Sequence, residues 1–300
     1  MAKTYAKKDH YQEITKAFIE SLEQCIEGDL QIPGWVKPWS SAGAPRNGFS
    51  NRPYRGMNSF IIGMKCAIKG WDDMRFATYN QIAKAGGQVN KGEKGTQVIM
   101  WKFIKDKKDP EGKKTIPLLR VFTVFNVNAQ STLDLPKVEA TNMDERIEHC
   151  EKVFQDIGAT IKHGGDSAFF SPSEDFIQMP NFENFKSAGD YYATLAHESI
   201  HWTGHESRLD RQLNEGRFGN EAYAFEELVA ELGASFLCQD LGIDGRFQDN
   251  HLAYLKSWLK VLKNDTHAIF RASSLATTAA KSILGDNIKE DEPQEDEAMA

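Results

Sequence analysis

The chain has 300 residues, 40% of them hydrophobic and 26% charged, with a formal net charge of −7 at pH 7. This composition is typical of globular domains, and the length favours two of them. It excludes a membrane protein, because no run reaches the roughly 18 apolar residues of a membrane span. The basic N-terminus is not followed by the apolar stretch of a signal peptide, and four widely spaced cysteines predict reduced thiols, so we expect a cytoplasmic protein.

The first part of the chain is expected to combine helices with a β-hairpin. Asp9 and Thr78 are candidate N-caps, and Gly28 and the glycines after residue 85 are candidate helix ends. A segment rich in Pro, Gly and Asn predicts an ordered loop, whereas two β-rich runs joined by a charged turn predict a hairpin. The expected elements are helices over 10–28, 59–71 and 78–87, a loop over 31–58, and strands over 96–106 and 115–128.

A domain boundary is expected where the charge changes sign. Up to residue 135 there are 21 Lys and Arg against 13 Asp and Glu, and the remainder has 15 against 30. Such asymmetry suggests an anionic partner for the first half, although two ordinary solvated surfaces would also explain it. We therefore predict domains over 1–130 and 143–285, separated by a polar linker over 131–142. The acidic tail, 286–300, is expected to be disordered.

The second part is expected to be mainly helical with a small sheet. An amphipathic helix over 143–157 precedes two short strands, TIKHGG and SAFFSPSEDFIQMP, of which DFIQMP is expected to border a cleft. Four helices are then predicted over 188–203, 221–240, 250–264 and 266–284. The predicted fold class is therefore α+β, with a mixed N-terminal domain and a mainly helical C-terminal one.

The helix over 188–203 contains His197, Glu198 and His201 in the pattern H-E-x-x-H. Residues four apart share a helical face, so both imidazoles can bind one ion. Zinc in catalytic sites takes three protein ligands and a water molecule. Glu198 is placed to accept a proton from that water, which is the role of a general base. The pattern predicts a site for zinc or another divalent transition metal.

The third metal ligand is expected to come from another helix. The metzincin pattern fails because Ser207 stands where its third histidine belongs, and His205 is read as a helix cap or a substrate contact. A glutamate pair four apart on a second, apolar helix is how gluzincins supply this ligand. On that pattern Glu227 binds the metal and Glu231 accepts a hydrogen bond from a ligating histidine. Glu226 is the alternative ligand, and Arg208 and Arg211 are read as ordinary surface ion pairs.

Residues 37–120 combine 17 basic with six acidic residues and several aromatic ones. Phosphates attract the basic groups and unpaired bases stack on aromatic rings, so this segment is expected to bind single-stranded DNA. The alternative is that most of these aromatic residues belong to the core, but Tyr54, flanked by Arg52 and Arg55 in a loop, is read as a contact. A phosphate-loop motif is excluded because Glu93 follows Gly92. The candidate contacts are Arg46, Asn47, Arg52, Tyr54, Arg55, Asn58, Lys91, Lys94, Trp101 and Lys102.

Several stretches resemble ArdC-type antirestriction proteins of conjugative plasmids, and the leading region of certain plasmid primases. They are WVKPW, PRNGFSNRPYRGMN, WDDMRFATYNQIAKAGGQVNKGEKGTQVIMW, HESIHWTGHESRLDR and FEELVAELGASFLC. The resemblance covers nearly the whole chain and implies a single-stranded-DNA-binding domain followed by a zincin-like metallopeptidase domain. It also implies protection of incoming plasmid DNA from host restriction. By this resemblance His197, Glu198, His201 and Glu227 match the metallopeptidase motif.

Three functions remain open at this point. The first is a DNA-binding antirestriction protein in which the metal domain is secondary, with the host restriction enzyme as a further candidate partner. The second is an active zinc endopeptidase that the basic half brings to peptide substrates on DNA. The third, an acidic mimic of DNA, is disfavoured for the whole chain by the basic first half.

Overall fold

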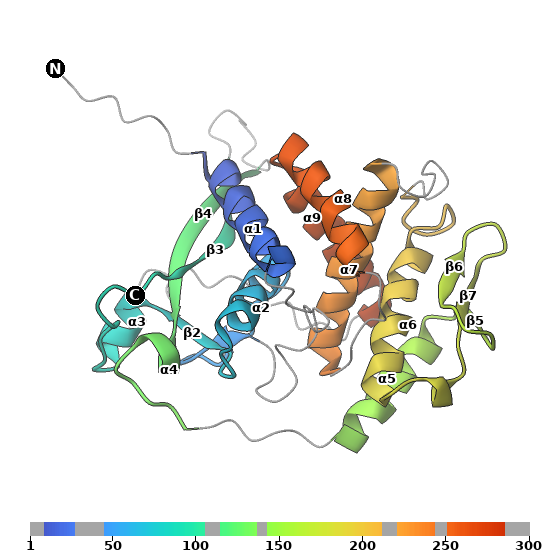
Figure 1. Ribbon diagram of the computed structural model, residues 1–300, viewed down its shortest axis with the longest axis horizontal. Coiled ribbons are helices and arrows are strands. Elements are labelled where there is room, and N and C mark those ends of the chain that lie inside the picture. Colours follow the sequence, from blue (N-terminus) through green and yellow to red (C-terminus); the bar gives the residue numbers. More distant parts are fainter. Residues whose placement is uncertain are drawn as a thin grey trace.

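The computed structural model describes residues 9–27, 45–105, 115–136, 143–211, 221–243 and 251–285. Figure 1 shows a twisted sheet at one end of the molecule, a smaller sheet at the other, and a layer of helices between them. The second half of the candidate linker, 137–142, and the whole acidic tail lie outside the described residues. Among those that are described, no helix is both long and apolar enough to cross a membrane.

The larger sheet has four strands in the order β1-β2-β4-β3. The short strand β1 (Arg46–Asn47) runs parallel to β2 (Arg75–Thr78), and the other pairs are antiparallel. Helix α2 (Met57–Lys69) packs on this sheet, and the short helices α3 (Tyr79–Lys84) and α4 (Val127–Gln130) follow β2 and β4. Thr78 caps α3 as predicted, in a reciprocal pair with Gln81.

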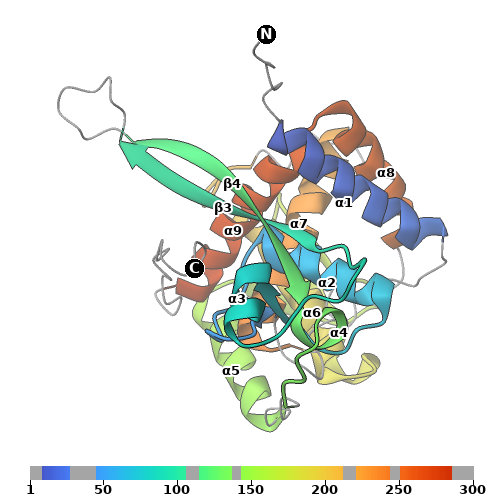
Figure 2. The same cartoon turned by 90° about the vertical axis from the view of Figure 1, so that its left-hand side faces the viewer.

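The predicted hairpin is confirmed. Strands β3 (Thr96–Lys105) and β4 (Thr115–Asn126) pair without interruption from Thr96 opposite Val124 to Lys105 opposite Thr115. β-Branched and aromatic residues dominate both runs, which favours extended backbone. In Figure 2 the hairpin extends as an arm beyond the helices. The charged turn at its tip lies outside the described residues.

The smaller sheet has three strands in the order β5-β7-β6. They are β5 (Thr160–His163), β6 (Phe169–Ser171) and β7 (Phe176–Met179). The prediction of two strands is wrong, because residues 172–175 form a turn in which Asp175 has a φ of 53°. Left-handed backbone at such a residue reverses the chain, so the second run becomes an antiparallel pair, β6 and β7.

The predicted helices are confirmed, with ends that differ by a few residues. Helix α1 is His10–Glu27, and Asp9 caps it by accepting a hydrogen bond from the backbone N–H of Tyr11 at 3.0 Å. The C-terminal helices are α5 (Met143–Asp156), α6 (Ala188–Thr203), α7 (Glu221–Leu241), α8 (His251–Asn264) and α9 (Ala268–Leu284).

One hydrophobic core connects the two ends of the chain. Ile14, Phe18 and Leu22 of α1 are at most 2% exposed and belong to the same buried cluster as the apolar faces of α6, α7 and α9. The hydroxyl of Thr15 donates a hydrogen bond to the carbonyl of Thr266 at 2.6 Å. Helix α1 is therefore packed against helices that follow it by more than 200 residues.

Candidate metal centre

Helix α6 presents the two histidines of the H-E-x-x-H motif on the side that faces α7. It begins after Ser187, whose side chain accepts a hydrogen bond from the backbone N–H of Asp190, and it ends at Gly204. Because α6 is regular from 188 to 203, His197 and His201 lie one turn apart. Both side chains are about 14% exposed.

Helix α7 supplies three glutamates to the same space. Glu227 and Glu231 are buried, at 6% and 4% exposure, in a helix whose other inward side chains are mostly apolar. The helices approach closely at Gly233, where an added Cβ atom would lie 2.7 Å from Cδ1 of Ile200 on α6. A side chain there would hold the helices apart, so Gly233 helps to set the distance between the histidines and the glutamates.

The side chains of His197, His201 and Glu227 converge on one point. The Nε2 atoms of the two histidines are 3.2 Å apart. The Glu227 carboxylate oxygens lie 3.7 Å from Nε2 of His197 and 3.5 Å from Nε2 of His201. Zinc bonds of about 2.0–2.1 Å in tetrahedral geometry place ligand atoms roughly 3.3 Å apart. These separations and this donor set therefore fit a divalent metal ion.

The acidic side chains of this cluster favour one positive charge beside them, either a proton on a histidine or a bound cation in its place. Burial alone would lower the pKa of His197, but Glu227, Glu231 and Glu198 together raise it to about 10. Burial alone would raise the pKa of Glu227, but His201 and His197 lower it to about 2. The Glu227 carboxylate is therefore ionised at neutral pH, as a metal ligand must be.

Two of the glutamates face the outer nitrogens of the histidines. Oε1 of Glu231 lies 3.8 Å from Nδ1 of His197. Oε1 of Glu226 lies 3.2 Å from Nδ1 of His201 and so forms a hydrogen bond on the far side of that ring from Glu227. Partners of this kind fix the orientation of a ligating imidazole. Glu226, the alternative ligand from the sequence, thus occupies a supporting position in the structure.

Arg211 binds the Glu226 carboxylate, which lies between Arg211 and His201. Its guanidinium donates hydrogen bonds to both carboxylate oxygens, at 3.0 and 2.7 Å. It also donates to the carbonyl of Ile200 and the hydroxyl of Thr203, at 2.6 and 2.8 Å. The Arg211 side chain is 4% exposed, so its predicted reading as an ordinary surface ion pair is wrong. Its role was missed because the contact depends on how the chain turns after α6.

Glu198 projects from α6 towards the small sheet. It is buried, at 8% exposure, and burial raises the pKa of its carboxyl group. The backbone N–H of Phe170 in β6 donates a hydrogen bond to this carboxylate. The strand beside Glu198 is thus the edge strand β6. The prediction named DFIQMP, which forms β7, and β7 is paired on both of its sides.

His205 and Arg208, which follow α6, lie outside the cluster of ligand atoms. Nδ1 of His205 lies 2.8 Å from the hydroxyl of Ser207, in the turn that follows Gly204. Arg208 donates two hydrogen bonds to the carboxylate of Asp175, and its guanidinium stacks over the ring of Trp202. Arg208 therefore ties this turn to the sheet.

Comparisons with known proteins place the chain in a family. The family described as the N-terminal domain of anti-restriction factor ArdC matches residues 8–125, and that described as zincin-like metallopeptidase matches residues 148–275. The crystal structure of antirestriction protein ArdC from plasmid R388 has a TM-score of 0.69 and 38% identity, covering 92% of this chain and 97% of that one. The chain belongs to the ArdC antirestriction family. A second structure of R388 ArdC, with Mn(II) bound, has a TM-score of 0.68.

Other relatives of this ArdC family member extend over nearly all of it. Protein y4eC of Sinorhizobium fredii is 35% identical over 91% of this chain and 90% of its own length. Two DNA primases named TraC from Escherichia coli are 36% and 38% identical over 93% of this chain. The chain spans only 27% and 20% of the length of those primases.

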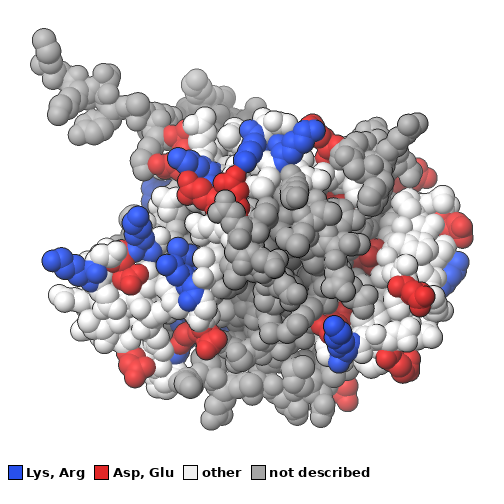
Figure 3. Space-filling view, in the orientation of Figure 1, with Lys and Arg blue, Asp and Glu red and all other residues white. Residues whose placement is uncertain are grey.

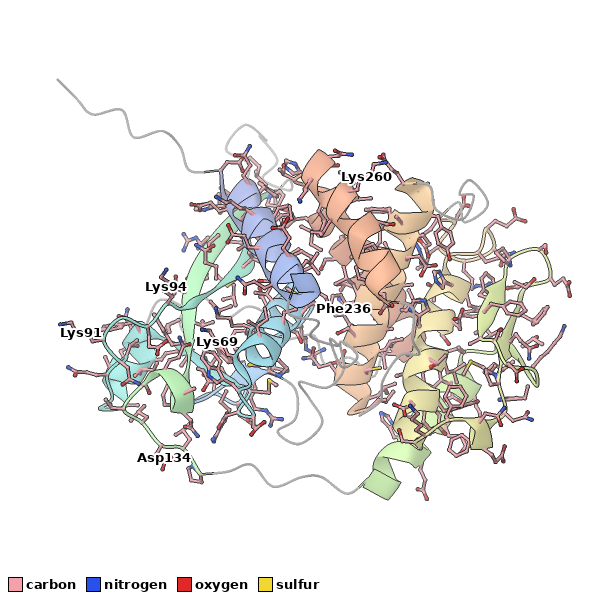
Figure 4. All side chains as sticks on the ribbon, in the orientation of Figure 1. Lys69, Lys91, Lys94, Asp134, Phe236 and Lys260 are labelled. Atoms are coloured by element: carbon pink, nitrogen blue, oxygen red, sulfur yellow. The ribbon has the colours of Figure 1, made fainter. Side chains whose placement is uncertain are left out.

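The candidate DNA contacts of this ArdC family member fall into three groups. Arg46 and Asn47 form β1, and Arg52 and Tyr54 follow the turn after it. Lys91 and Lys94 are exposed before β3, at the end of the molecule that carries α3 (Figure 4). Trp101 and Lys102 lie on the hairpin arm. On the visible face, basic and acidic side chains are interspersed over the described surface (Figure 3).

Two further candidates are engaged in contacts within the protein. The Asn58 side chain both donates to and accepts from the backbone of Ile99 in β3, at 2.7 and 2.8 Å. Arg55 lies 3.5 Å from the carboxylate of Asp240 at the C-terminal end of α7. Next to it, the side-chain amide of Gln239 donates to the carbonyl of Tyr54 at 2.7 Å. These contacts fasten the turn to the helix that supplies Glu227.

Proposed function

We propose that this ArdC family member protects incoming plasmid DNA from host restriction, and that it does so as a single-stranded-DNA-binding protein. The observation that carries the proposal is its similarity over almost the full chain to the antirestriction protein of plasmid R388. The excess of basic residues before residue 136 supports DNA as the partner. Cys66, Cys150 and Cys238 are buried thiols, which supports the cytoplasm of a bacterial cell as its location.

In this proposal His197, His201 and Glu227 hold one divalent metal ion, and we propose zinc. The same three donors also suit manganese, the ion in the second R388 structure. Metal binding is tested by elemental analysis of the purified protein, and by the rise in its melting temperature when Zn²⁺ or Mn²⁺ is added. Saturation at 100 times the dissociation constant stabilises the fold by about 2.7 kcal/mol. A protein without bound metal and without such a rise contradicts this part of the proposal.

The alternative function is an active endopeptidase that cleaves proteins on DNA. The observation that favours it is the place of Glu198, buried between the metal ligands and the edge strand β6. A divalent ion held by the three ligands would lower the pKa of a water molecule bound to it. Glu198 would be the group that accepts the proton, and its raised pKa suits a group that would donate it again later. The hydroxyl of Tyr223 forms a hydrogen bond with Glu227, so a hydrogen-bond donor lies next to the candidate metal ligands.

One substitution separates the two functions. Glu198→Ala removes the base and leaves the three ligands unchanged, so it is expected to retain the metal. Under the main proposal, plasmid transfer into a restricting host remains protected by the Glu198→Ala variant. Loss of protection with unchanged metal content and unchanged affinity for single-stranded DNA establishes the endopeptidase alternative. A wild-type protein that gives no protection overturns both.

A further inference from the structure

The ring of Tyr54 is partly buried against the core. It packs with Phe76 in the apolar cluster under α2, and its hydroxyl donates to the Phe76 carbonyl at 3.4 Å. Burial raises the pKa of Tyr54 to about 12. A base can stack only on a ring face that reaches solvent. Tyr54, which the sequence suggested for base contact, therefore supports the turn instead of presenting a stacking surface.

Two other aromatic side chains do reach solvent. Tyr79 is 55% exposed and Phe49 is 39% exposed, which makes them the most exposed aromatic residues in the described part of the chain before residue 137. Exposed aromatic residues on a rigid framework are common in binding sites, because they offer a large contact area at a small cost in entropy.

Phe49 and Tyr79 leave the sheet at the same end of the β1–β2 pair. Asn47 lies opposite Phe76 in this parallel pair, and the backbone N–H of Gly48 continues the ladder to the Phe76 carbonyl at 3.0 Å. The side-chain amide of Asn47 also donates to Gln81 in α3 at 3.1 Å. Because Tyr79 is the first residue of α3, the two aromatic residues are held by one hydrogen-bonded unit.

The turn that presents Phe49 is fixed by its own hydrogen bonds. The side-chain oxygen of Asn47 accepts from the backbone N–H groups of Phe49 and Ser50, both at 3.0 Å. Asn51 has a φ of 60°, and the backbone N–H of Asn47 donates to the carbonyl of Arg52 at 2.7 Å. A site held in place before binding loses little entropy when a ligand orders on it.

The turn that presents Phe49 also carries two basic residues. Arg46 and Arg52 stand at its two ends, and Arg46 contacts Asn51 at 3.4 Å. The carboxylate of Asp73, next to β2, is paired with Arg75 at 2.6 Å. Two positive charges on the turn suit the phosphates of a nucleic-acid backbone.

We propose that Phe49 and Tyr79 form a stacking site for two unpaired bases of single-stranded DNA, with Arg46 and Arg52 binding the adjacent phosphates. This inference rests on the proposed single-stranded-DNA binding and names the site where it occurs. The site recognises bases through their ring faces, so it tolerates different sequences. A base within a duplex is already stacked on its neighbours, so duplex DNA binds more weakly.

The test measures binding of the full chain to a fluorescein-labelled oligothymidylate by anisotropy, over a series of salt concentrations. Phe49→Ala and Tyr79→Ala are each expected to weaken binding by about 5- to 100-fold, with the salt dependence unchanged. Arg46→Ala and Arg52→Ala are each expected to lower the slope of log affinity against log salt by about 0.7. Phe182→Ala is the matched control, since this phenylalanine is similarly exposed, at 44%, on the other domain.

The outcomes separate this inference from the proposed function. A wild-type chain that does not bind the oligonucleotide overturns the proposed DNA binding itself. If the wild type binds but Phe49→Ala and Tyr79→Ala behave like Phe182→Ala, the stacking site is wrong while DNA binding stands. A second measurement does not depend on variants: photo-crosslinking to an oligonucleotide with 5-iododeoxyuridine should map to Phe49 or Tyr79. Crosslinks confined to other residues, or equal affinity for duplex DNA, contradict the site.

Discussion

Arg211 and Glu226 form a two-pronged ion pair directly behind one of the candidate metal ligands. The guanidinium holds both carboxylate oxygens, and the carboxylate in turn lies 3.2 Å from Nδ1 of His201. Arg211 also binds the carbonyl of Ile200, one residue before His201. One buried side chain thus positions both the ring and the backbone of a ligand.

We expect Arg211→Ala to weaken metal affinity by about 10- to 100-fold, which is the usual effect of losing a partner of a ligating residue. The variant removes the two guanidinium hydrogen bonds that hold the Glu226 carboxylate, so the His201 ring loses its fixed orientation. Chelator competition measures this affinity. Arg208→Ala is the control, because Arg208 forms the same kind of pair with Asp175 but supports the turn. Equal effects of the two substitutions contradict the role of Arg211.

Glu227→Ala and Glu226→Ala are expected to affect metal binding to different extents. Removing Glu227 takes away one of three ligands, so the purified protein should contain little metal. Removing Glu226 leaves the three ligands in place and should reduce affinity by no more than about 100-fold. Elemental analysis after dialysis against a weak chelator compares the two proteins. Comparable metal content in both variants would contradict the assignment of Glu227 as a ligand.

Gly233→Ala is expected to separate α6 from α7. Its new Cβ would lie 2.7 Å from Ile200, and such overpacking costs about 1–3 kcal/mol. The higher helix propensity of alanine offsets up to about 1 kcal/mol of that cost. Urea denaturation of the metal-free protein measures the loss, and chelator competition should show weaker metal binding as well. In Gly233→Ala/Ile200→Ala the new methyl group fills space that Ile200 vacates, so the double variant should be more stable than the summed single costs predict.

Asn58→Ala is expected to destabilise the fold and not to act as the loss of a DNA contact. It leaves the N–H and the carbonyl of Ile99 without their side-chain partner, which costs about 1–3 kcal/mol. Urea denaturation should show this loss, while the salt dependence of DNA binding stays that of the wild type. The contrast is Lys91→Ala, which should leave stability unchanged and reduce that salt dependence. Unchanged stability of Asn58→Ala would return Asn58 to the candidate contacts.

The sequence predicted features that depend on neighbours within one element. The spacing of His197 and His201 follows from the helical repeat, and Glu227 followed from the placement of a carboxylate on an apolar helix face. The hairpin was equally local. Each of these signals lies within a single helix or a single hairpin, so no knowledge of the packing was needed.

Features that depend on packing between distant segments were not predicted. Nothing near Arg211 in the sequence shows that it reaches Glu226 across 15 residues, and so it read as a surface residue. Tyr54 stands between arginines in a loop-like stretch, which suggests exposure, but its ring fills the space beside Phe76. The amphipathic pattern of α1 predicted a buried face without indicating that the covering helices come from the opposite end of the chain.

The place of α1 has a consequence for how the chain folds during synthesis. Its apolar face, with Ile14, Phe18 and Leu22, is covered by helices that include residues beyond 250, so α1 leaves the ribosome well before the helices that cover it. Until those helices emerge, the growing chain exposes a hydrophobic stripe that attracts chaperones or other nascent chains. A premature stop codon ahead of α8 would therefore leave this face of α1 uncovered.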